Sequence, residues 1–133
     1  MELSGGCQCG AVRYRVTAEP QHATLCHCSD CRKSAGAPMV AWAGFAEADF
    51  AVTAGEPVTF NSSGASFRSF CGMCGTGLIF RNDEMLPGIV DIQSATLDDP
   101  EQLPPSAHIQ ALEELAWMKS AHELPRFERY PSE

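Results

Sequence analysis

The sequence predicts a small, mainly β domain, and three observations support this fold class. Short segments that alternate in polarity or are rich in β-branched and aromatic residues recur along the chain, separated by glycine, proline, asparagine and serine. A length of 133 residues corresponds to one domain. A hydrophobic content of 44% argues against disorder. Because no linker interrupts the pattern, we expect a single domain over residues 1–133, built from short antiparallel sheets with a few short helical segments.

Each expected strand follows from its local pattern. AVRYRVT alternates as a half-buried strand does, whereas PMVAWAGF is apolar enough for a buried one. AEADFAVT is ambiguous and is interpreted as a short helical turn that leads into a strand. The turn segments NSSGA and NDEMLP each separate two strand-like runs, and the second predicts a hairpin. The expected strands are residues 11–17, 38–45, within 46–53, 57–60, 66–70, 78–81 and 88–97.

The C-terminal quarter has a different pattern. Residues 98–106 are rich in proline and acidic residues and predict a loop. Residues 108–123 are interpreted as an amphipathic helix, followed by an irregular end. The apolar face of this helix would carry Ile109, Leu112, Leu115 and Ala116.

Charge and hydropathy exclude some classes of partner. The formal net charge is −8, from 17 acidic and 9 basic residues, which disfavours nucleic acid as a partner. No apolar run approaches the roughly 20 residues that span a bilayer, so no membrane partner is expected. The N-terminus lacks the basic and apolar regions of a secretory signal, so we expect a cytoplasmic protein. The sequence is also compatible with a homodimer.

Seven cysteines in three groups are the main functional signal. In a reducing compartment, clustered cysteines favour metal or redox chemistry over disulfides, and an odd number argues against a complete disulfide framework. The groups are Cys7-Gln8-Cys9, then Cys26-His27-Cys28-Ser29-Asp30-Cys31, and finally Cys71-Gly72-Met73-Cys74 before Gly75.

Two of the groups are cysteine pairs that together can fill one tetrahedral zinc site. The C-x-x-C-G spacing lets both sulfur atoms reach one ion, and the glycine permits the tight turn. In C-x-C, an extended backbone would place both side chains on one face. The alternatives are buried free thiols or a disulfide. This four-cysteine cluster consists of Cys7, Cys9, Cys71 and Cys74.

The remaining group, the three-cysteine cluster, consists of Cys26, Cys28 and Cys31. Structural zinc usually has four protein ligands, whereas catalytic zinc usually has three and an open position, so this cluster favours an open site. The alternatives are a fourth ligand from His22, His27 or Asp30, a redox-active dithiol, or idle thiols.

Other side chains have simpler interpretations. His27 lies between two cysteines and is expected to pack against the site, while His22, His108 and His122 lack a motif. Candidate anion-binding residues are Arg32 and Lys33, which follow Cys31, and Arg68. Trp42, Phe45, Phe67 and Phe80 are expected in the core.

Three segments together resemble the glutathione-dependent formaldehyde-activating enzyme family. They are GGCQCGAVRY at 5–14, CHCSDCRKSAG at 26–36 and SFRSFCGMCGTGL at 66–78, and the tail with HI at 108–109, Trp117 and LPRF at 124–127 is also similar. The resemblance covers essentially the whole chain and implies an Mss4-like fold. It also implies two zinc ions per chain, a structural one at the four-cysteine cluster and a catalytic one at the three-cysteine cluster.

The implied activity is that of a carbon–sulfur lyase similar to S-(hydroxymethyl)glutathione synthase. A thiolate-rich zinc suits a soft fourth ligand, so a thiol such as glutathione would bind there and add to, or be released from, a small aldehyde such as formaldehyde. Arg32, Lys33 or Arg68 would bind a substrate carboxylate, and Asp30 and His27 are candidate proton donors by proximity. The competing hypotheses are a zinc module that binds a protein through the acidic region 98–123, and a thiol redox or metal-buffering protein.

Overall fold

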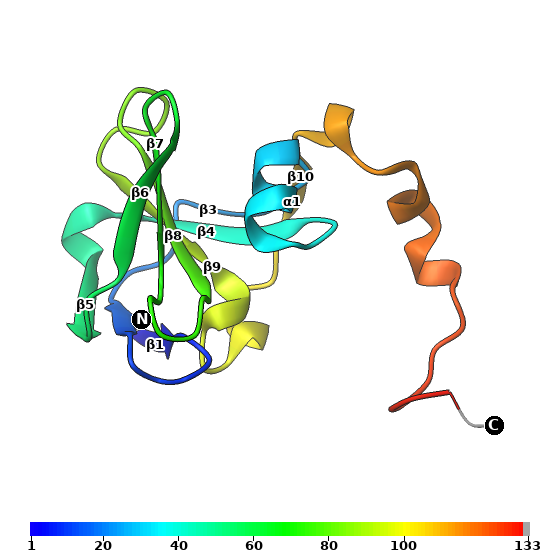
Figure 1. The fold of residues 1–133 in the computed structure, drawn as a ribbon, viewed down its shortest axis with the longest axis horizontal. Helices are drawn as coiled ribbons and strands as arrows, with labels where there is room; N and C mark the ends of the chain where they lie inside the picture. Colours follow the sequence, from blue (N-terminus) through cyan, green and yellow to red (C-terminus); the bar gives the residue numbers. More distant parts are fainter. Residues whose placement is uncertain (132–133) are drawn as a thin grey trace.

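The computed structural model describes residues 1–131, which form two β-sheets, one α-helix and several short 3₁₀ turns. The smaller sheet has the order β1-β2-β5, and the larger has the order β10-β3-β4-β9-β8-β7-β6 (Figure 1). The small sheet comprises β1 (Leu3–Gly6), β2 (Arg13–Val16) and β5 (Phe50–Ala54). The large sheet comprises β3 (His22–Cys26), β4 (Val40–Ala46), β6 (Val58–Ser63), β7 (Ser66–Phe70), β8 (Gly77–Asn82), β9 (Ile89–Gln93) and β10 (Ala107–Ile109).

The mainly β prediction is confirmed, and most expected strands are present. The two predicted turn segments join β6 to β7 and β8 to β9 as antiparallel neighbours. Residues 46–53 do pass from a 3₁₀ turn, η1 (Glu47–Asp49), into β5. The strands β1, β3 and β10 are not predicted, because they are short and have no clear alternation.

The two faces of the large sheet have different roles. On β4, Ala43 and Phe45 face the small sheet, where they pack with Tyr14 and Val16 in the main core. Side chains alternate along a strand, so Trp42 points to the opposite face and packs in a second cluster with Cys26 and Cys31. The main core is therefore separate from the face that carries the three-cysteine cluster. The expectation for Phe67 is wrong, since its side chain is 45% exposed on β7.

The only α-helix among residues 1–131 is α1 (Ser29–Ala35), which is not predicted because its seven residues include five polar or charged ones. Its N-terminus is capped by the sulfur of Cys28, which accepts a hydrogen bond from the backbone N–H of Cys31. Gly36 ends the helix at φ 64°, a left-handed conformation that favours glycine. The three-cysteine motif thus starts the helix that it helps to hold.

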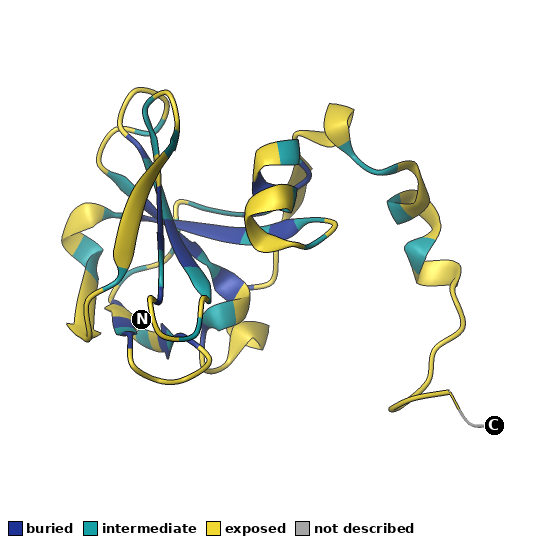
Figure 2. Cartoon of the chain, viewed as in Figure 1, coloured by how far each residue is buried: buried dark blue, intermediate teal, exposed yellow. Residues whose placement is uncertain are grey.

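The predicted helix over residues 108–123 is wrong. Its first part continues β10, which pairs in parallel with the edge of β3, and Gln110 then takes a left-handed conformation at φ 54°. The rest forms two 3₁₀ segments, η4 (Ala111–Glu113) and η5 (Ala116–Glu123), without a buried residue. Hydrogen bonding to β3 and the backbone turn at Gln110 override the apolar periodicity. Beyond β10 the segment extends away from the sheets and is mostly exposed (Figures 1 and 2).

Two further 3₁₀ turns, η2 (Ser94–Thr96) and η3 (Pro100–Gln102), follow β9 and lead the chain back toward the small sheet. The hydroxyl groups of Tyr14 and Thr96 are 2.8 Å apart, which joins β2 to this region. Within the described part of the chain, no helix combines the length and the apolar character that crossing a membrane requires.

Candidate metal centres

Two similar turns form the four-cysteine cluster. Cys7 and Cys9 lie directly after β1, and Cys71 and Cys74 lie between β7 and β8. In each turn a glycine N–H donates to the carbonyl of the first cysteine, from Gly10 to Cys7 at 3.1 Å and from Gly75 to Cys71 at 2.8 Å. Both glycines have positive φ values, 81° and 84°, which other residues rarely adopt. Residues 7–9 are therefore a turn, and the expectation of an extended C-x-C segment is wrong.

The sulfur atoms of this cluster have the spacing of a tetrahedral metal site. The Sγ of Cys9 is 3.6 Å from that of Cys7 and 3.8 Å from that of Cys71. Zn–S bonds of about 2.3 Å in a tetrahedron place neighbouring sulfurs about 3.8 Å apart, so the residues fit zinc. Backbone N–H groups of Val12 and Met73 donate to the sulfurs of Cys7 and Cys71. The first of these hydrogen bonds is the largest cause of a lowered Cys7 pKa.

Thr76 connects the two turns of this cluster. Its hydroxyl oxygen accepts a hydrogen bond from the backbone N–H of Gln8 at 3.1 Å and lies 3.2 Å from the sulfur of Cys74. The contact with Thr76 is the largest cause that lowers the pKa of Cys74 to about 5. The cluster therefore joins the end of β1 in the small sheet to the β7–β8 turn of the large sheet, and a metal bound there would hold the two sheets together.

The three-cysteine cluster lies on the other face of the large sheet. Cys26 is the last residue of β3, Cys28 caps α1, and Cys31 lies in its first turn. Their sulfur atoms are all within 4.8 Å of one another, a spacing compatible with one metal ion. Among residues 1–131, no histidine, carboxylate or further cysteine joins this group. The alternative in which His22, His27 or Asp30 completes four protein ligands is not supported by this geometry.

Arg68 is a cation in contact with one of these sulfurs. Its side chain extends from β7, is buried, and donates from Nη2 toward the Sγ of Cys31 at 3.8 Å. The guanidinium lies 4.9 Å from the ring centre of Phe80. Within the described residues it forms no salt bridge with a carboxylate. A buried cation needs a compensating charge, and the thiolates of the cluster are the groups that supply it.

The same contacts separate the pKa values of the three cysteines. Hydrogen bonding with Cys26, followed by that with Cys28 and Arg68, lowers the pKa of Cys31 to about 5. The interaction with Cys31 raises the pKa of Cys26, and burial raises that of Cys28. Cys31 is therefore the thiol that ionises first, next to the guanidinium of Arg68.

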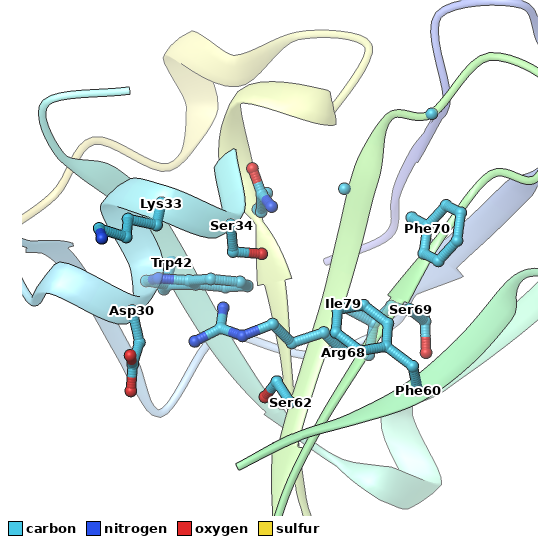
Figure 3. Close-up of a pocket in the computed structure, with 13 residues that line it drawn as sticks. Asp30, Lys33, Ser34, Trp42, Phe60, Ser62, Arg68, Ser69, Phe70 and Ile79 are labelled. Carbon is cyan, nitrogen blue, oxygen red and sulfur yellow. The ribbon is translucent and has the colours of Figure 1, made fainter. Parts of the chain in front are cut away.

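Two cavities meet at Arg68. The first, the thiolate cavity, has a volume of about 260 Å³ and is lined by the three-cysteine cluster together with His22, Trp42, Phe80 and Asp91. The second, the aromatic cavity, has a volume of about 360 Å³ and lies between Trp42, Phe60 and Phe70. Arg68, Trp42 and Asp30 line both. Figure 3 shows Arg68 reaching from its strand toward the side of the aromatic cavity formed by Asp30 and Trp42.

The structure brings together only some of the predicted substrate residues. Arg68 and Lys33 line the aromatic cavity, whereas Arg32 lines neither of the two cavities. The Nε of Arg32 instead donates to the carbonyl of His27 at 3.3 Å. His27 is fully buried and lines neither cavity, so the geometry does not favour it as a proton donor. Asp30 lines both cavities and remains the candidate proton donor.

His27 has a packing role, as its position between two cysteines predicts. Its Nε2 lies 2.8 Å from the Nδ1 of His108 and 3.7 Å from a carboxylate oxygen of Glu114. The backbone N–H of His27 also donates to the carbonyl of Ile109. These contacts join the cysteine loop to β10 and to the segment that follows it. No local motif marks His108, because its partner His27 is 81 residues away in the sequence.

Sequence reasoning also missed a pair formed by His22 and Asp91. The Nε2 of His22 lies 2.6 Å from Oδ1 of Asp91, on the face that carries the three-cysteine cluster. The two residues pair with the same position of β4, namely Gly44, so they lie in one row across three strands. The one feature of the sequence that could have indicated this pair is Gly44. A glycine within a buried strand often marks a position that another group approaches closely.

The fold and the two cysteine clusters define a small β protein with two candidate metal sites. The profile of the glutathione-dependent formaldehyde-activating enzyme family matches residues 2–112. A Halomonas elongata protein named "Putative glutathione-dependent formaldehyde-activating enzyme" is 33% identical over 147 aligned residues, which cover 100% of this chain and 91% of that protein. This chain belongs to the glutathione-dependent formaldehyde-activating enzyme family.

A solved structure supports the fold. The crystal structure of a Rhodobacter sphaeroides protein superposes with a TM-score of 0.65 at 24% sequence identity, covering 80% of this chain and 99% of that one. At this identity the similarity shows a shared fold.

Proposed function

We propose that this protein is a zinc-dependent carbon–sulfur lyase that promotes the reversible addition of a thiol such as glutathione to a small aldehyde such as formaldehyde. The observation that carries the proposal is the three-cysteine cluster, whose sulfurs converge beside a cavity without a fourth protein ligand within residues 1–131. Three protein ligands and an open position are typical of catalytic zinc. Membership of the family supports the same thiol and aldehyde.

The donor set decides what a metal would contribute. A zinc ion held by the three thiolates would accept a thiol sulfur as a soft further ligand and lower its pKa. Arg68, next to Cys31, would offset the negative charge that accumulates when another thiolate enters the cavity. The four-cysteine cluster would hold a second, structural zinc, giving two zinc ions per chain.

The overall reaction balances without a further reactant. A sulfur lone pair forms a bond to the carbonyl carbon, the π pair of the C=O bond moves to oxygen, and that oxygen takes the proton that the thiol has given up. Asp30 lines both cavities and is the candidate to carry this proton. Lys33 and Arg68 line the aromatic cavity, where they would bind a carboxylate of the thiol.

The proposal is tested with protein whose zinc has been replaced by cobalt. Glutathione should increase the sulfur-to-cobalt charge-transfer absorption, because one more thiolate binds the metal. S-methylglutathione, which lacks a free thiol, is the matched control and should leave the spectrum unchanged. In a parallel exchange-NMR experiment, the zinc protein should accelerate exchange between glutathione, formaldehyde and their adduct, and Cys28→Ser should not. An unchanged cobalt spectrum with glutathione contradicts the proposal.

Among residues 1–131, the structure does not contain the helix on which the alternative of a non-catalytic docking module depends. That hypothesis depends on an amphipathic helix in the acidic C-terminal region, whereas residues 111–123 form only 3₁₀ segments. The redox alternative predicts reversible oxidation of the three-cysteine cluster with loss of zinc. The exchange experiment separates it from the lyase.

A further inference from the structure

The His22–Asp91 pair places a carboxyl group and an imidazole ring side by side on the large sheet. Asp91 lies in the middle of β9 and is only 4% exposed. Its one hydrogen-bond partner within residues 1–131 is the Nε2 of His22, at 2.6 Å. Burial raises the pKa of Asp91, and the nearby His22 opposes this only in part. A carboxylate in this position destabilises the fold unless another cation or donor approaches it.

Gly44 makes room for the pair. His22 and Asp91 flank Gly44 on the strands at either side of β4, and the imidazole ring lies across that position. A Cβ atom on residue 44 would be 2.5 Å from the Nε2 of His22. The imidazole therefore reaches Asp91 only because residue 44 has no side chain. The strands β3, β4 and β9 thus each contribute one residue to this arrangement, as expected of a specific binding site.

The pair presents hydrogen-bond acceptors to the thiolate cavity. With Nε2–H of His22 directed at Asp91, Nδ1 is the second ring nitrogen, and it carries a lone pair whenever the ring has a single proton. Neither that nitrogen nor Oδ2 of Asp91 makes a hydrogen bond within the described residues. Both side chains line the same cavity as the three-cysteine cluster. These two acceptor atoms would be satisfied by a ligand that carries several N–H donors.

The charges around the cavity favour a cationic donor. Asp30, Asp91 and Glu113 line it against the single cation Arg68, among the described residues, and the cysteines add negative charge. A primary ammonium carries one positive charge and three donors, which matches a carboxylate next to an imidazole acceptor.

The spacing indicates the size of the ligand. His22 and Cys26 are the first and last residues of β3, so their Cα atoms are about 13 Å apart at the usual rise of a strand. An aldehyde alone is too short to reach from the cysteines to the pair. A peptide-like thiol is long enough.

We propose that His22 and Asp91 form an ammonium-binding subsite that recognises the amino group of a peptide-like thiol whose sulfur lies at the three-cysteine cluster. The sulfur position rests on the proposed function. The ammonium subsite itself rests on the pair, on Gly44 and on the cavity, and it makes His22 and Asp91 specificity-determining residues.

The test uses two probes without a free thiol, S-methylglutathione and its N-acetyl derivative, titrated into the zinc-loaded full chain and followed by NMR at the His22 ring nitrogens. The amino probe should shift the His22 signals and bind about tenfold more tightly or better, the effect expected of a charge-assisted hydrogen bond. Asp91→Asn, which keeps the shape, and His22→Gln should each remove this preference. Asp98→Asn, on the exposed Arg13–Asp98 pair, is the matched control and should keep it.

Equal affinity for the two probes, no change at His22, or a preference that survives in both variants overturns the proposal. Failure of the proposed function has a different signature. In that case glutathione leaves the cobalt spectrum unchanged, while the thiol-free probes still distinguish an amino group at His22.

Discussion

The Nη2 of Arg68 lies 3.8 Å from the Sγ of Cys31, and this contact joins strand β7 of the large sheet to the three-cysteine cluster. The two residues are 37 positions apart, one on β7 and the other on α1. The guanidinium is buried and has no carboxylate partner within residues 1–131, so its charge acts mainly on the thiolates and on whatever enters the two cavities.

Replacing Arg68 with methionine, which has a similar length but no charge, should weaken metal binding at the three-cysteine cluster. Hydrogen bonds to charged groups contribute about 1.5–3 kcal/mol, so we expect zinc affinity there to fall about tenfold or more. Competition with a chromophoric chelator measures it. Arg81→Met, on the exposed Arg81–Glu47 pair, is the control and should not change zinc affinity. Equal affinities in both variants would show that Arg68 does not act on the thiolates.

The two cysteine clusters should respond differently to serine. Cys71→Ser removes a ligand from the cluster that joins the sheets, and structural zinc contributes roughly 10–16 kcal/mol of apparent binding energy to folding, so this variant should be largely unfolded. Cys28→Ser should lose one zinc and keep the fold, because the main core lies on the other face of the sheet. Circular dichroism and zinc content measure both effects. Unfolding of the Cys28 variant would assign its cluster a structural role.

Gly44→Ala should destabilise the protein by forcing the His22 ring from its position. Overpacking at buried sites typically destabilises by about 1–3 kcal/mol, and the new methyl would lie 2.5 Å from Nε2 of His22. Chemical denaturation measures the change. The double variant His22→Ala/Gly44→Ala should recover part of the loss, because the clash is absent. If the destabilisation of the double variant equals the sum of those of the two single variants, a clash with the His22 ring does not cause the effect of Gly44→Ala.

Asp91→Asn should stabilise the protein, increasingly so as the pH rises. Burial raises the pKa of Asp91 in the folded state, so its ionisation destabilises the fold. The contribution of the protonated carboxyl is complete below the unfolded pKa of about 3.9 and is lost as the pH rises through the raised value. The variant does not titrate at this position. Its advantage over wild type should therefore be larger at pH 8 than at pH 4, which is close to the unfolded pKa.

Denaturation curves at both pH values measure that advantage, and the same comparison in a His22→Gln background removes the contribution of His22. An advantage that shrinks with pH would mean that the carboxylate stabilises the fold. A more stable variant that no longer distinguishes the amino probe would indicate that Asp91 is present for binding.

Local signals explain which parts of the fold the sequence predicts. The turn segments before β7 and β9 are visible because turn residues separate strand-like runs. The cysteine spacing divides seven residues into groups of four and three, and the structure places them in these two groups. By contrast, β10 depends on pairing with the edge of β3, which no local pattern reveals. The helical periodicity of residues 108–123 is misleading for the same reason.

The site beyond the cysteines depends on contacts that are distant in the sequence. His22 and Asp91 are 69 residues apart, and each looks unremarkable in its own strand. Arg68 is predicted to bind substrate because it is close to Cys71 in the sequence, yet it reaches the other cluster. Arg32 is close to Cys31 in sequence but bonds to the carbonyl of His27. Proximity along the chain was therefore a poor guide to which side chains line the cavities.

The most direct test of the central claim is native mass spectrometry of the purified chain, with and without glutathione. The account predicts two zinc ions per chain and, on adding glutathione, one bound glutathione that Cys28→Ser cannot retain. Two zinc ions with no glutathione adduct, or an adduct that persists in the Cys28 variant, would contradict an open three-cysteine zinc site that accepts a thiol.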